Sequence, residues 1–316
     1  MMHVHEHIEQ LPRFKNAVIT IGTFDGVHLG HKAIIDQLKR TAQEISGETV
    51  IITFDPHPRT IISSVPGDLK LLTLIHEKAK LLNEAGIDHL VVVPFNTAFA
   101  MQTADEYIRD FLFEKFKPHT IIIGYDHRFG KGRNGDFTML EAYGKELGFT
   151  VDEIEGQNVA EVVVSSTKVR NALLESNIEK ANSYLGYSYF FSGKVIAGNQ
   201  LGRTIGFPTA NLQIAAAEKL IPGNGVYAVT AVLNKHNVFS SHKGMMNIGF
   251  RPTVDGKRRM IEVNLLDFSD DIYDCTLEVH VHAFIRGEVK FDGIDGLKAQ
   301  LQKDAIVARE LLTKIE

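Results

Sequence analysis

The 316-residue sequence contains a single cysteine, Cys275. One thiol excludes an intramolecular disulfide and a zinc site built from several cysteines, and it fits a reducing, cytoplasmic setting. The chain also lacks any run of about eighteen apolar residues, so we expect no transmembrane helix and no membrane partner. The first fifteen residues lack the apolar stretch of a secretory signal, which agrees with a cytoplasmic protein.

Positive charge is not in excess, since the chain has 34 Lys and Arg but 39 Asp and Glu, which gives a formal net charge of −5. This balance gives no support for a nucleic-acid partner, which would require a basic face. Anionic small molecules would have to be held by local groups rather than by the overall field. Low-complexity segments and internal repeats are absent, and 44% hydrophobic residues over this length predict two globular domains.

The first half of the chain alternates strand-like apolar runs with helical patterns. The predicted strands cover residues 17–21, 49–54, 90–93 and 120–123. Helical patterns follow the first strand and cover residues 77–84 and 104–116. Strands interleaved with helices predict an α/β domain with a doubly wound parallel sheet that is covered on both faces.

The pattern changes after residue 184, because helical periodicity nearly disappears from residue 189 to residue 284. Strands are predicted at residues 226–233, 260–265 and 276–283. In the last of these, apolar and polar residues alternate, which is typical of an antiparallel strand with one wet face. We expect a small antiparallel barrel or sandwich, followed by a helix over residues 297–315.

The change of pattern predicts two domains, residues 1–185 and 186–316. A short N-terminal stretch, in which His3, His5 and His7 alternate, predicts an exposed terminal strand, with a metal site as the alternative.

A loop with three glycines joins the first predicted strand to the first helix and reads GTFDGVHLGH from Gly22 to His31. It follows the carboxyl end of a parallel strand, where open α/β sheets bind ligands. Gly22 and Gly26 allow a sharp turn and a close approach to a ligand. The helix is expected to begin near His28, so its free N–H groups would favour a phosphate. His28 and His31 should point the same way, with Gly30 leaving the space between them open.

Two imidazoles aimed at a phosphate can stabilise the charge that builds during nucleotidyl transfer. The residues alone leave two alternatives open. One is an ordinary helix start with two surface histidines, and the other is a two-histidine metal pair without an assignable third ligand.

A cluster of hydroxyls, Ser165, Ser166 and Thr167, precedes Arg170 near the end of this half. Three hydroxyls at a helix start can cap the helix and donate to phosphate oxygens. Arg170 can bind a phosphate group. Taken alone, the same residues also describe a helix cap with a solvated arginine.

Together the two stretches resemble the H-x-G-H and I-S-S-T-x-V-R motifs of the nucleotidyltransferase superfamily, with Val164 in place of the isoleucine. Members of this superfamily join a nucleoside monophosphate to a phosphorylated acceptor and release pyrophosphate. The resemblance implies that His28, His31 and Arg170 are catalytic. It also implies an ATP site made of Gly22, Phe24, Asp25, Gly26, Ser165, Ser166 and Thr167.

Two further loops, FDPHP at residues 54–58 and GYDHRFG at residues 124–130, resemble those of the bacterial FAD synthetases. This resemblance implies that Phe54, Pro56 and His57 bind the flavin. It places Asp126 in the ATP and Mg²⁺ region. For His57, an ordinary loop residue stays an alternative.

The second half contains the glycine-rich run GRTIGFPTAN, from Gly202 to Asn211, whose backbone N–H groups can wrap a polyphosphate. It lacks the G-K-[ST] ending of a Walker loop. Thr209 and Asn211 are two residues apart, so in an extended segment both can offer oxygens to Mg²⁺ from one side. Without further context, the alternative is a Gly/Pro turn with no chemistry.

This run and three later ones, GVYAV, NIGFRPT and IEVNLLDF, resemble the riboflavin kinases. With the N-terminal motifs they cover nearly the whole chain, which is therefore identified as resembling the bacterial bifunctional riboflavin kinase/FMN adenylyltransferases. The resemblance implies a C-terminal β-barrel kinase domain with a terminal helix, Glu262 as general base, and Arg286 near the flavin. It implies that Thr209 and Asn211 hold Mg²⁺ with ATP. The kinase ATP site would consist of Gly202, Gly206, Pro208, Thr209 and Asn211.

The family often has histidine where Asn264 stands and glycine where Asp274 stands. We expect phosphorylation of riboflavin to FMN, and then adenylyl transfer from ATP to FMN to give FAD and pyrophosphate. Flavoenzymes that receive the products are further candidate partners, and the sequence does not define an oligomeric state. Two rival hypotheses are an adenylyltransferase for another phosphorylated acceptor with an inactive kinase-like domain, and a flavin-binding regulator without turnover.

Overall fold

The computed structural model describes residues 1–62, 69–124, 127–154, 158–159, 162–198, 201–253 and 256–314. Internal contacts divide the chain into two compact units, Met1–Ser166 and Thr167–Glu316. The boundary expected from the sequence, at residues 185–186, stays a prediction.

The first unit is built on a six-stranded parallel sheet with the order β1-β4-β3-β2-β5-β6. Its strands are β1 (His3–His5), β2 (Val18–Ile21), β3 (Thr49–Asp55), β4 (His89–Pro94), β5 (Thr120–Gly124) and β6 (Thr150–Ile154). The central strands β2, β3 and β5 are apolar and almost entirely buried, because helices cover both faces of the sheet. From β2 the chain continues to β3 and β4 on one side of β2, and it then returns to form β5 on the other side. The strand order therefore reverses at β2, and open parallel sheets bind ligands in the crevice at such a point.

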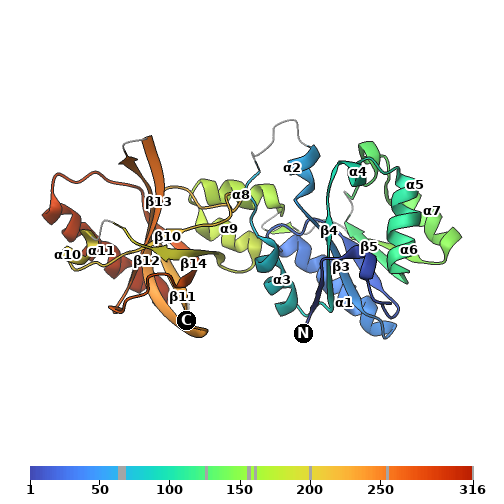
Figure 1. Ribbon diagram of the computed structural model, residues 1–316, viewed down its shortest axis with the longest axis horizontal. Helices are drawn as coiled ribbons and strands as arrows, with labels where there is room; N and C mark the ends of the chain where they lie inside the picture. Colours follow the sequence, from blue (N-terminus) through green and yellow to red (C-terminus); the bar gives the residue numbers. More distant parts are fainter. Residues whose placement is uncertain are drawn as a thin grey trace. The chain divides into compact units, whose positions relative to one another are not determined.

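Helices α1 (Leu29–Glu44) and α3 (Ile75–Glu84) pack against one face of this sheet (Figure 1). The other face is covered by α7 (Phe137–Leu147) and by a continuous helical stretch, Ala104 to Phe116. That stretch was predicted as one helix; the structure divides it into α5 (Ala104–Glu106), a π-helical η2 (Tyr107–Phe113) and α6 (Glu114–Phe116). Shorter elements are η1 (Ile8–Gln10), α2 (Pro58–Ile62), α4 (Thr97–Ala100), η3 (Lys131–Arg133), β7 (Asn158–Val159) and β8 (Val162–Val163).

The second unit contains a closed antiparallel barrel with the strand order β10-β13-β12-β11-β14-β9. Its strands are β9 (Tyr189–Ile196), β10 (Ala210–Gln213), β11 (Gly225–Lys235), β12 (Val238–Thr253), β13 (Gly256–Leu265) and β14 (Thr276–Arg286). The pairing of β9 with β10 closes the sheet, which decides the sequence alternative in favour of a barrel. The α/β domain and the β-barrel with a terminal helix are thus confirmed.

Four helices accompany the barrel among the described residues: α8 (Ser166–Leu174), α9 (Ile178–Leu185), α10 (Leu201–Thr204) and α11 (Ile294–Thr313). The terminal helix α11 buries Ala308 and Leu312 against Ala228, Met245 and Ala283 of the barrel. In the described part of the chain, no helix is both long and apolar enough to cross a bilayer.

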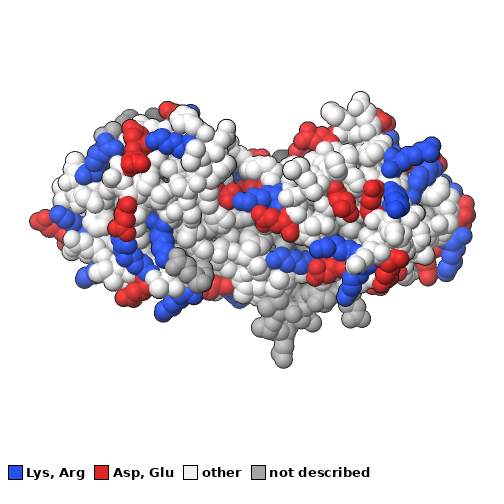
Figure 2. All heavy atoms as spheres, turned by 90° about the horizontal axis from the view of Figure 1, so that it is seen from below, with Lys and Arg blue, Asp and Glu red and all other residues white. Residues whose placement is uncertain are grey.

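Lysine and arginine side chains lie intermixed with aspartate and glutamate on the face drawn in Figure 2. No extended region of one sign is visible on that face. An anionic ligand on this face would therefore have to be held by local groups rather than by an extended field.

Candidate active sites

The turn between β2 and α1 has a strained backbone. Phe24, Gly26 and Val27 have positive φ angles of 46°, 85° and 37°. Glycine adopts such angles freely, but for a β-branched valine they are costly, on the order of 1–3 kcal/mol. Such strain persists only where surrounding contacts enforce it, and it is common at binding and catalytic sites.

Asp25 supplies those contacts, since its side chain is only 1% exposed and points into the protein. Its Oδ1 accepts the backbone N–H groups of Leu72, at 2.9 Å, and Thr73, at 3.0 Å. The Thr73 hydroxyl in turn accepts the N–H of Gly26 at 2.9 Å. The Asp25 carboxylate therefore holds the turn. Thr73 is a supporting residue that the sequence motifs do not reveal.

His28 and His31 are stacked, with ring centroids 3.7 Å apart and planes 15° from parallel. As the spacing predicted, α1 begins directly after His28, and both rings point the same way. A Cβ atom at Gly30 would lie 3.1 Å from Cε1 of His28, so a larger residue would press on that ring. Because His28 is only 6% exposed, it is not a surface histidine.

Burial lowers the pKa of His31 well below its usual value, and positive charge at His28 and Lys78 lowers it further. The imidazole of His31 is therefore neutral at pH 7 and carries one N–H donor. Within the described ranges its Nδ1 has no hydrogen-bond partner. The ring of Phe24 packs 4.8 Å away, centroid to centroid, so Phe24 supports His31 from inside the turn.

The hydroxyl of Ser166 donates to the backbone carbonyl of Asp25 at 2.9 Å. This bond joins the hydroxyl motif to the histidine turn across 141 positions of sequence. Ser166 also begins α8, so hydroxyls do stand at a helix start as expected. Arg170 is buried four residues later on the same helix, which places it on the helix face that carries Ser166. Ser165 is half-buried and Thr167 is exposed.

The residues expected to bind the flavin lie at and after the end of β3. The ring of Phe54 packs against Phe95 and Phe99, at centroid distances of 5.5 Å and 5.6 Å. Nδ1 of His57 accepts the backbone N–H of Arg59 at 3.1 Å, and Pro56 is exposed. Their flavin contacts stay predictions, and Asp126 lies outside the described residues.

The glycine-rich loop of the second unit folds back on itself, because the N–H of Phe207 donates to the carbonyl of Gly202 at 2.8 Å. A Cβ atom at Gly202 would overlap the Phe207 carbonyl, and Gly206 has a φ of 84°. The amide of Asn264 donates to the carbonyl of Pro208 at 2.7 Å. This contact fixes the end of the loop, where the exposed Thr209 directly precedes β10.

Asn211, Glu262 and Asn247 form one rung across three neighbouring strands, because Glu262 pairs with Asn211 on β10 and with Asn247 on β12. Residues directly opposite each other point to the same face of a sheet. Asn211 is 5% exposed, and its Oδ1 lacks a hydrogen-bond donor among the residues that the structure describes. The sequence did not single out Asn247, because only the strand register brings it beside Glu262.

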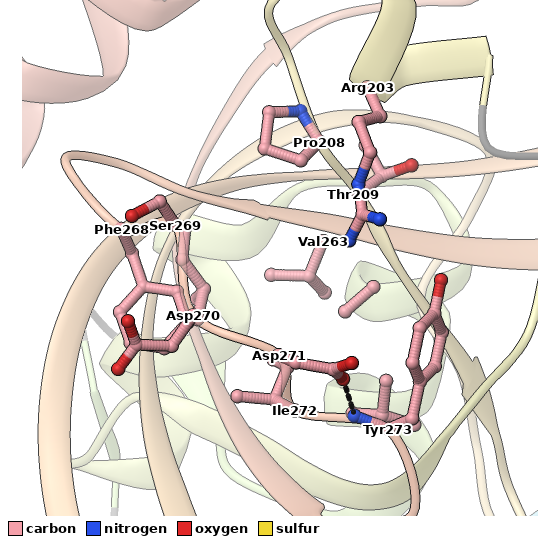
Figure 3. A pocket seen from close by; sticks show the side chains of 13 residues that line it. Arg203, Pro208, Thr209, Val263, Phe268, Ser269, Asp270, Asp271, Ile272 and Tyr273 are labelled. Atoms are coloured by element: carbon pink, nitrogen blue, oxygen red, sulfur yellow. Dashed lines mark hydrogen bonds between the residues drawn. The ribbon is translucent and has the colours of Figure 1, made fainter.

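A cavity of about 240 Å³ adjoins this loop and is shown in Figure 3. Arg203 and Thr209 reach it from the loop, and Asp271 and Tyr273 line it from the segment after β13. Its apolar lining consists of Val195, Pro208, Ala210, Val263, Leu265, Phe268 and Ile272. The register pairs Ala210 with Val263, whereas Asn211 pairs with Glu262, so the cavity and the Glu262 rung lie on opposite faces of β10 and β13. Sequence reasoning named Phe268 and Tyr273 at the ends of this segment but missed residues 269–272 between them.

Arg286 is engaged within the second unit. Its guanidinium donates to both carboxylate oxygens of Asp304 on α11, at 2.6 Å and 2.9 Å for the shortest bonds. Asp304 is 1% exposed, so this pair joins β14 to α11 in the interior. The expected role of Arg286 near the flavin stays a prediction.

Over the described part of the chain, no group of three or more His, Cys, Asp or Glu side chains could hold a metal ion. Among the described residues, therefore, neither the His28–His31 pair nor His3 and His5 on β1 belong to such a group. A cation in the second unit would depend on amide and hydroxyl oxygens together with phosphate oxygens.

Comparisons with known proteins agree with this division into two sites. A family model described as FAD synthetase matches residues 11–168, and one described as riboflavin kinase matches residues 185–312. A bifunctional riboflavin kinase/FMN adenylyltransferase of Listeria monocytogenes is 39% identical and covers 95% of this chain and 94% of its own length. The protein of the same description from Escherichia coli is 38% identical, over 98% of this chain and 97% of its own.

Among solved structures, a crystal structure described as a macrolide-efflux protein from Streptococcus pneumoniae has a TM-score of 0.89 and 29% identity. The match covers 98% of both chains, so the two proteins share the whole two-unit architecture. With two family models and near full-length relatives in agreement, the chain belongs to the family of bifunctional riboflavin kinase/FMN adenylyltransferases.

Proposed function

We propose that this chain is an enzyme that makes FMN and then FAD from riboflavin, and that each of its two units uses ATP. The observation that carries this proposal is that both units match the families of the corresponding activities, one each. The geometry supports it, because His28 stacks on His31 and Ser166 contacts their turn in the first unit, whereas Asn211 pairs with Glu262 in the second. From the single cysteine, Cys275, we also infer that the enzyme works in the reducing cytoplasm.

In the second unit, the reaction is phosphoryl transfer to a ribityl hydroxyl of riboflavin. The carboxylate of Glu262 takes the hydroxyl proton while that oxygen forms a bond to the γ-phosphorus of ATP. The bond between the γ-phosphorus and the bridging oxygen breaks, and ADP leaves. We place the adenosine end of ATP in the apolar cavity beside Arg203 and Thr209, and riboflavin on the opposite face with Glu262.

The residues present fit a bound Mg²⁺. The buried Oδ1 of Asn211 and the hydroxyl of Thr209 are hard oxygen ligands at the end of the phosphate loop. When bound with ATP, Mg²⁺ would neutralise phosphate charge. Asp126 remains a second proposed contact for Mg²⁺ in the first unit.

In the first unit, a phosphate oxygen of FMN attacks the α-phosphorus of a second ATP, and pyrophosphate leaves. The neutral imidazole of His31 and the ring of His28 stacked on it donate hydrogen bonds to the phosphate oxygens on which charge builds. The hydroxyls of Ser165 and Ser166 hold the departing pyrophosphate, and the roles of Thr167 and Arg170 stay predictions from the motif. No nucleophilic side chain is needed, so catalysis rests on positioning and charge stabilisation.

Chromatography of the products from riboflavin, ATP and Mg²⁺ tests the proposal, with FMN and then FAD as the expected products. FMN and phosphopantetheine supplied as separate acceptors distinguish the rival adenylyltransferase, which would consume ATP with the second acceptor and leave riboflavin unphosphorylated. Flavin binding without ATP turnover would instead indicate a regulator and defeat the proposal.

A further inference from the structure

Lys78 on α3 is a buried cation that the reaction described above does not use. Its side chain is 4% exposed, and within the described residues its ammonium has a single hydrogen-bond acceptor, Oγ1 of Thr53 at 3.0 Å. Burial lowers the pKa of Lys78 to about 8, although the carboxylates of Asp25 and Asp55 oppose that shift. A buried ammonium is costly to the folded state unless close negative charge compensates it.

The ammonium lies beneath the histidine turn. Thr53 is fully buried on β3. Its hydroxyl accepts the hydrogen bond from Lys78 and donates one to the backbone carbonyl of Thr23 at 3.1 Å. Thr23 directly precedes Phe24, whose ring packs on His31. Lys78 is therefore connected to the turn through one hydroxyl, and its charge acts on His31.

We propose that Lys78 is a positioning residue for adenylyl transfer, which uses its buried positive charge and its bond to Thr53 to hold the histidine turn in reactive geometry. This inference rests on the proposed function of the first unit. It extends that function to a residue outside the sequence motifs, on a helix that carries none of them.

The balance of charge explains why a lysine occupies this position. Desolvation of the ammonium outweighs the attraction of Asp25 and Asp55, since the pKa of Lys78 is lowered, so packing alone does not account for a lysine here. A positive charge under the turn opposes protonation of His31, which keeps its imidazole neutral. The same charge is favourable when negative charge builds on the phosphates in front of the turn. Groups that cost stability but serve charge stabilisation are typical of active sites.

The test uses the full-length enzyme with Lys78→Met, Lys78→Arg and, as a control, Lys80→Met at an exposed position of the same helix. FAD formation from supplied FMN and ATP is measured over pH 5.5–9, and FMN formation from riboflavin reports on the other unit of the same molecule. For Lys78→Met we expect kcat of FAD formation to fall on the order of tenfold to a hundredfold. FMN formation and the Lys80→Met enzyme should be unchanged, and Lys78→Arg should keep more activity than Lys78→Met.

Two readouts separate positioning from a merely structural role. NMR titration should show a higher pKa of His31 in Lys78→Met, and the acid limb of the FAD profile should move to higher pH. Wild-type rates of FAD formation in Lys78→Met would overturn the inference, and so would a lower unfolding midpoint with an unchanged His31 pKa. If the wild-type enzyme itself forms no FAD, the proposed function of the first unit fails, whereas normal FAD formation in both enzymes defeats the role of Lys78 alone.

Discussion

Asn211 on β10 is the direct cross-strand neighbour of Glu262 on β13. The Cβ atoms of such neighbours lie about 5 Å apart on the same face of the sheet. The proposed ligand of the cation and the proposed general base are therefore placed together by backbone pairing, and not by flexible loops. The barrel fixes the distance between the two groups before any substrate binds.

Glu262→Gln keeps the shape of the side chain but removes the carboxylate that would accept the riboflavin proton. We expect FMN formation to fall on the order of a hundredfold or more, while FAD formation from supplied FMN stays at the wild-type rate. Glu310→Gln, at an exposed position of α11, is the control for loss of one negative charge. Riboflavin phosphorylation at the normal rate in Glu262→Gln would show that Glu262 is not the base.

Substitutions of Asn264 test what holds the glycine-rich loop of residues 202–211 in place, because the Asn264 amide donates to the carbonyl of Pro208. Asn264→Leu leaves that carbonyl without its donor, so we expect the KM for ATP of FMN formation to rise. Asn264→His keeps an N–H donor at this position, so its KM for ATP should stay close to that of the wild type. Equal KM values for all three enzymes in steady-state kinetics would mean that this bond does not position the loop.

The sequence predicted much of the fold because the central sheet strands and three barrel strands, β11, β13 and β14, follow regular patterns of buried residues, whereas β9, β10 and β12 were not predicted. The continuous apolar runs of β2, β3, β4 and β5 and the alternation in β14 correspond to the observed burial. The edge strand β6, which reads TVDEI, was not predicted, since an edge strand can be largely exposed and then lacks an apolar run. The expectation of a terminal strand at His3 and His5 is confirmed as β1, which pairs in parallel with β4.

The sites were predicted only as far as sequence motifs extend. The contact between Ser166 and Asp25 and the rung that includes Asn247 depend on tertiary contacts and strand register, which no local pattern encodes. Lys78 lies in an ordinary amphipathic helical pattern, where a lysine is normally solvated, so its burial could not be foreseen.

His31 is the residue whose loss should most clearly separate the two activities. His31→Asn removes the neutral imidazole that we propose faces the phosphates, and we expect FAD formation to fall on the order of 10²- to 10³-fold. FMN formation should persist, since it depends on the other unit. His76→Asn, at an exposed position on α3, is the matched control. Unchanged FAD formation in His31→Asn would contradict the assignment of the histidine motif.

His282 should make the second unit sensitive to acid. Burial lowers its pKa to about 4, and the hydroxyls of Ser188 and Thr230 contact its two ring nitrogens at 3.0 Å and 2.8 Å. The folded state therefore binds fewer protons than the unfolded state below pH 6.5. The stability that His282 contributes is present above pH 6.5 and is lost as the pH falls toward 4.

Urea unfolding of the second unit at pH 7 and pH 5 measures this effect. The free energy of unfolding should decrease with acid in the wild type and should decrease less in His282→Gln. His236→Gln, in the turn between β11 and β12, controls for the loss of a histidine elsewhere. An identical pH dependence in the wild type and His282→Gln would exclude His282 as the group that titrates.

Arg286 and Asp304 form a buried ion pair, and its disruption separates a structural role of Arg286 from a role in flavin binding. Arg286→Met leaves the Asp304 carboxylate buried without its cation, which should destabilise the second unit by about 3–5 kcal/mol. Arg286→Met combined with Asp304→Leu removes both charges, so it should recover most of that loss. Denaturant unfolding of both variants and of Asp304→Leu alone completes the cycle. If the double variant regains stability but still has a raised KM for riboflavin, Arg286 contacts the flavin as well; if KM returns with stability, the guanidinium acts only by fixing α11 to β14.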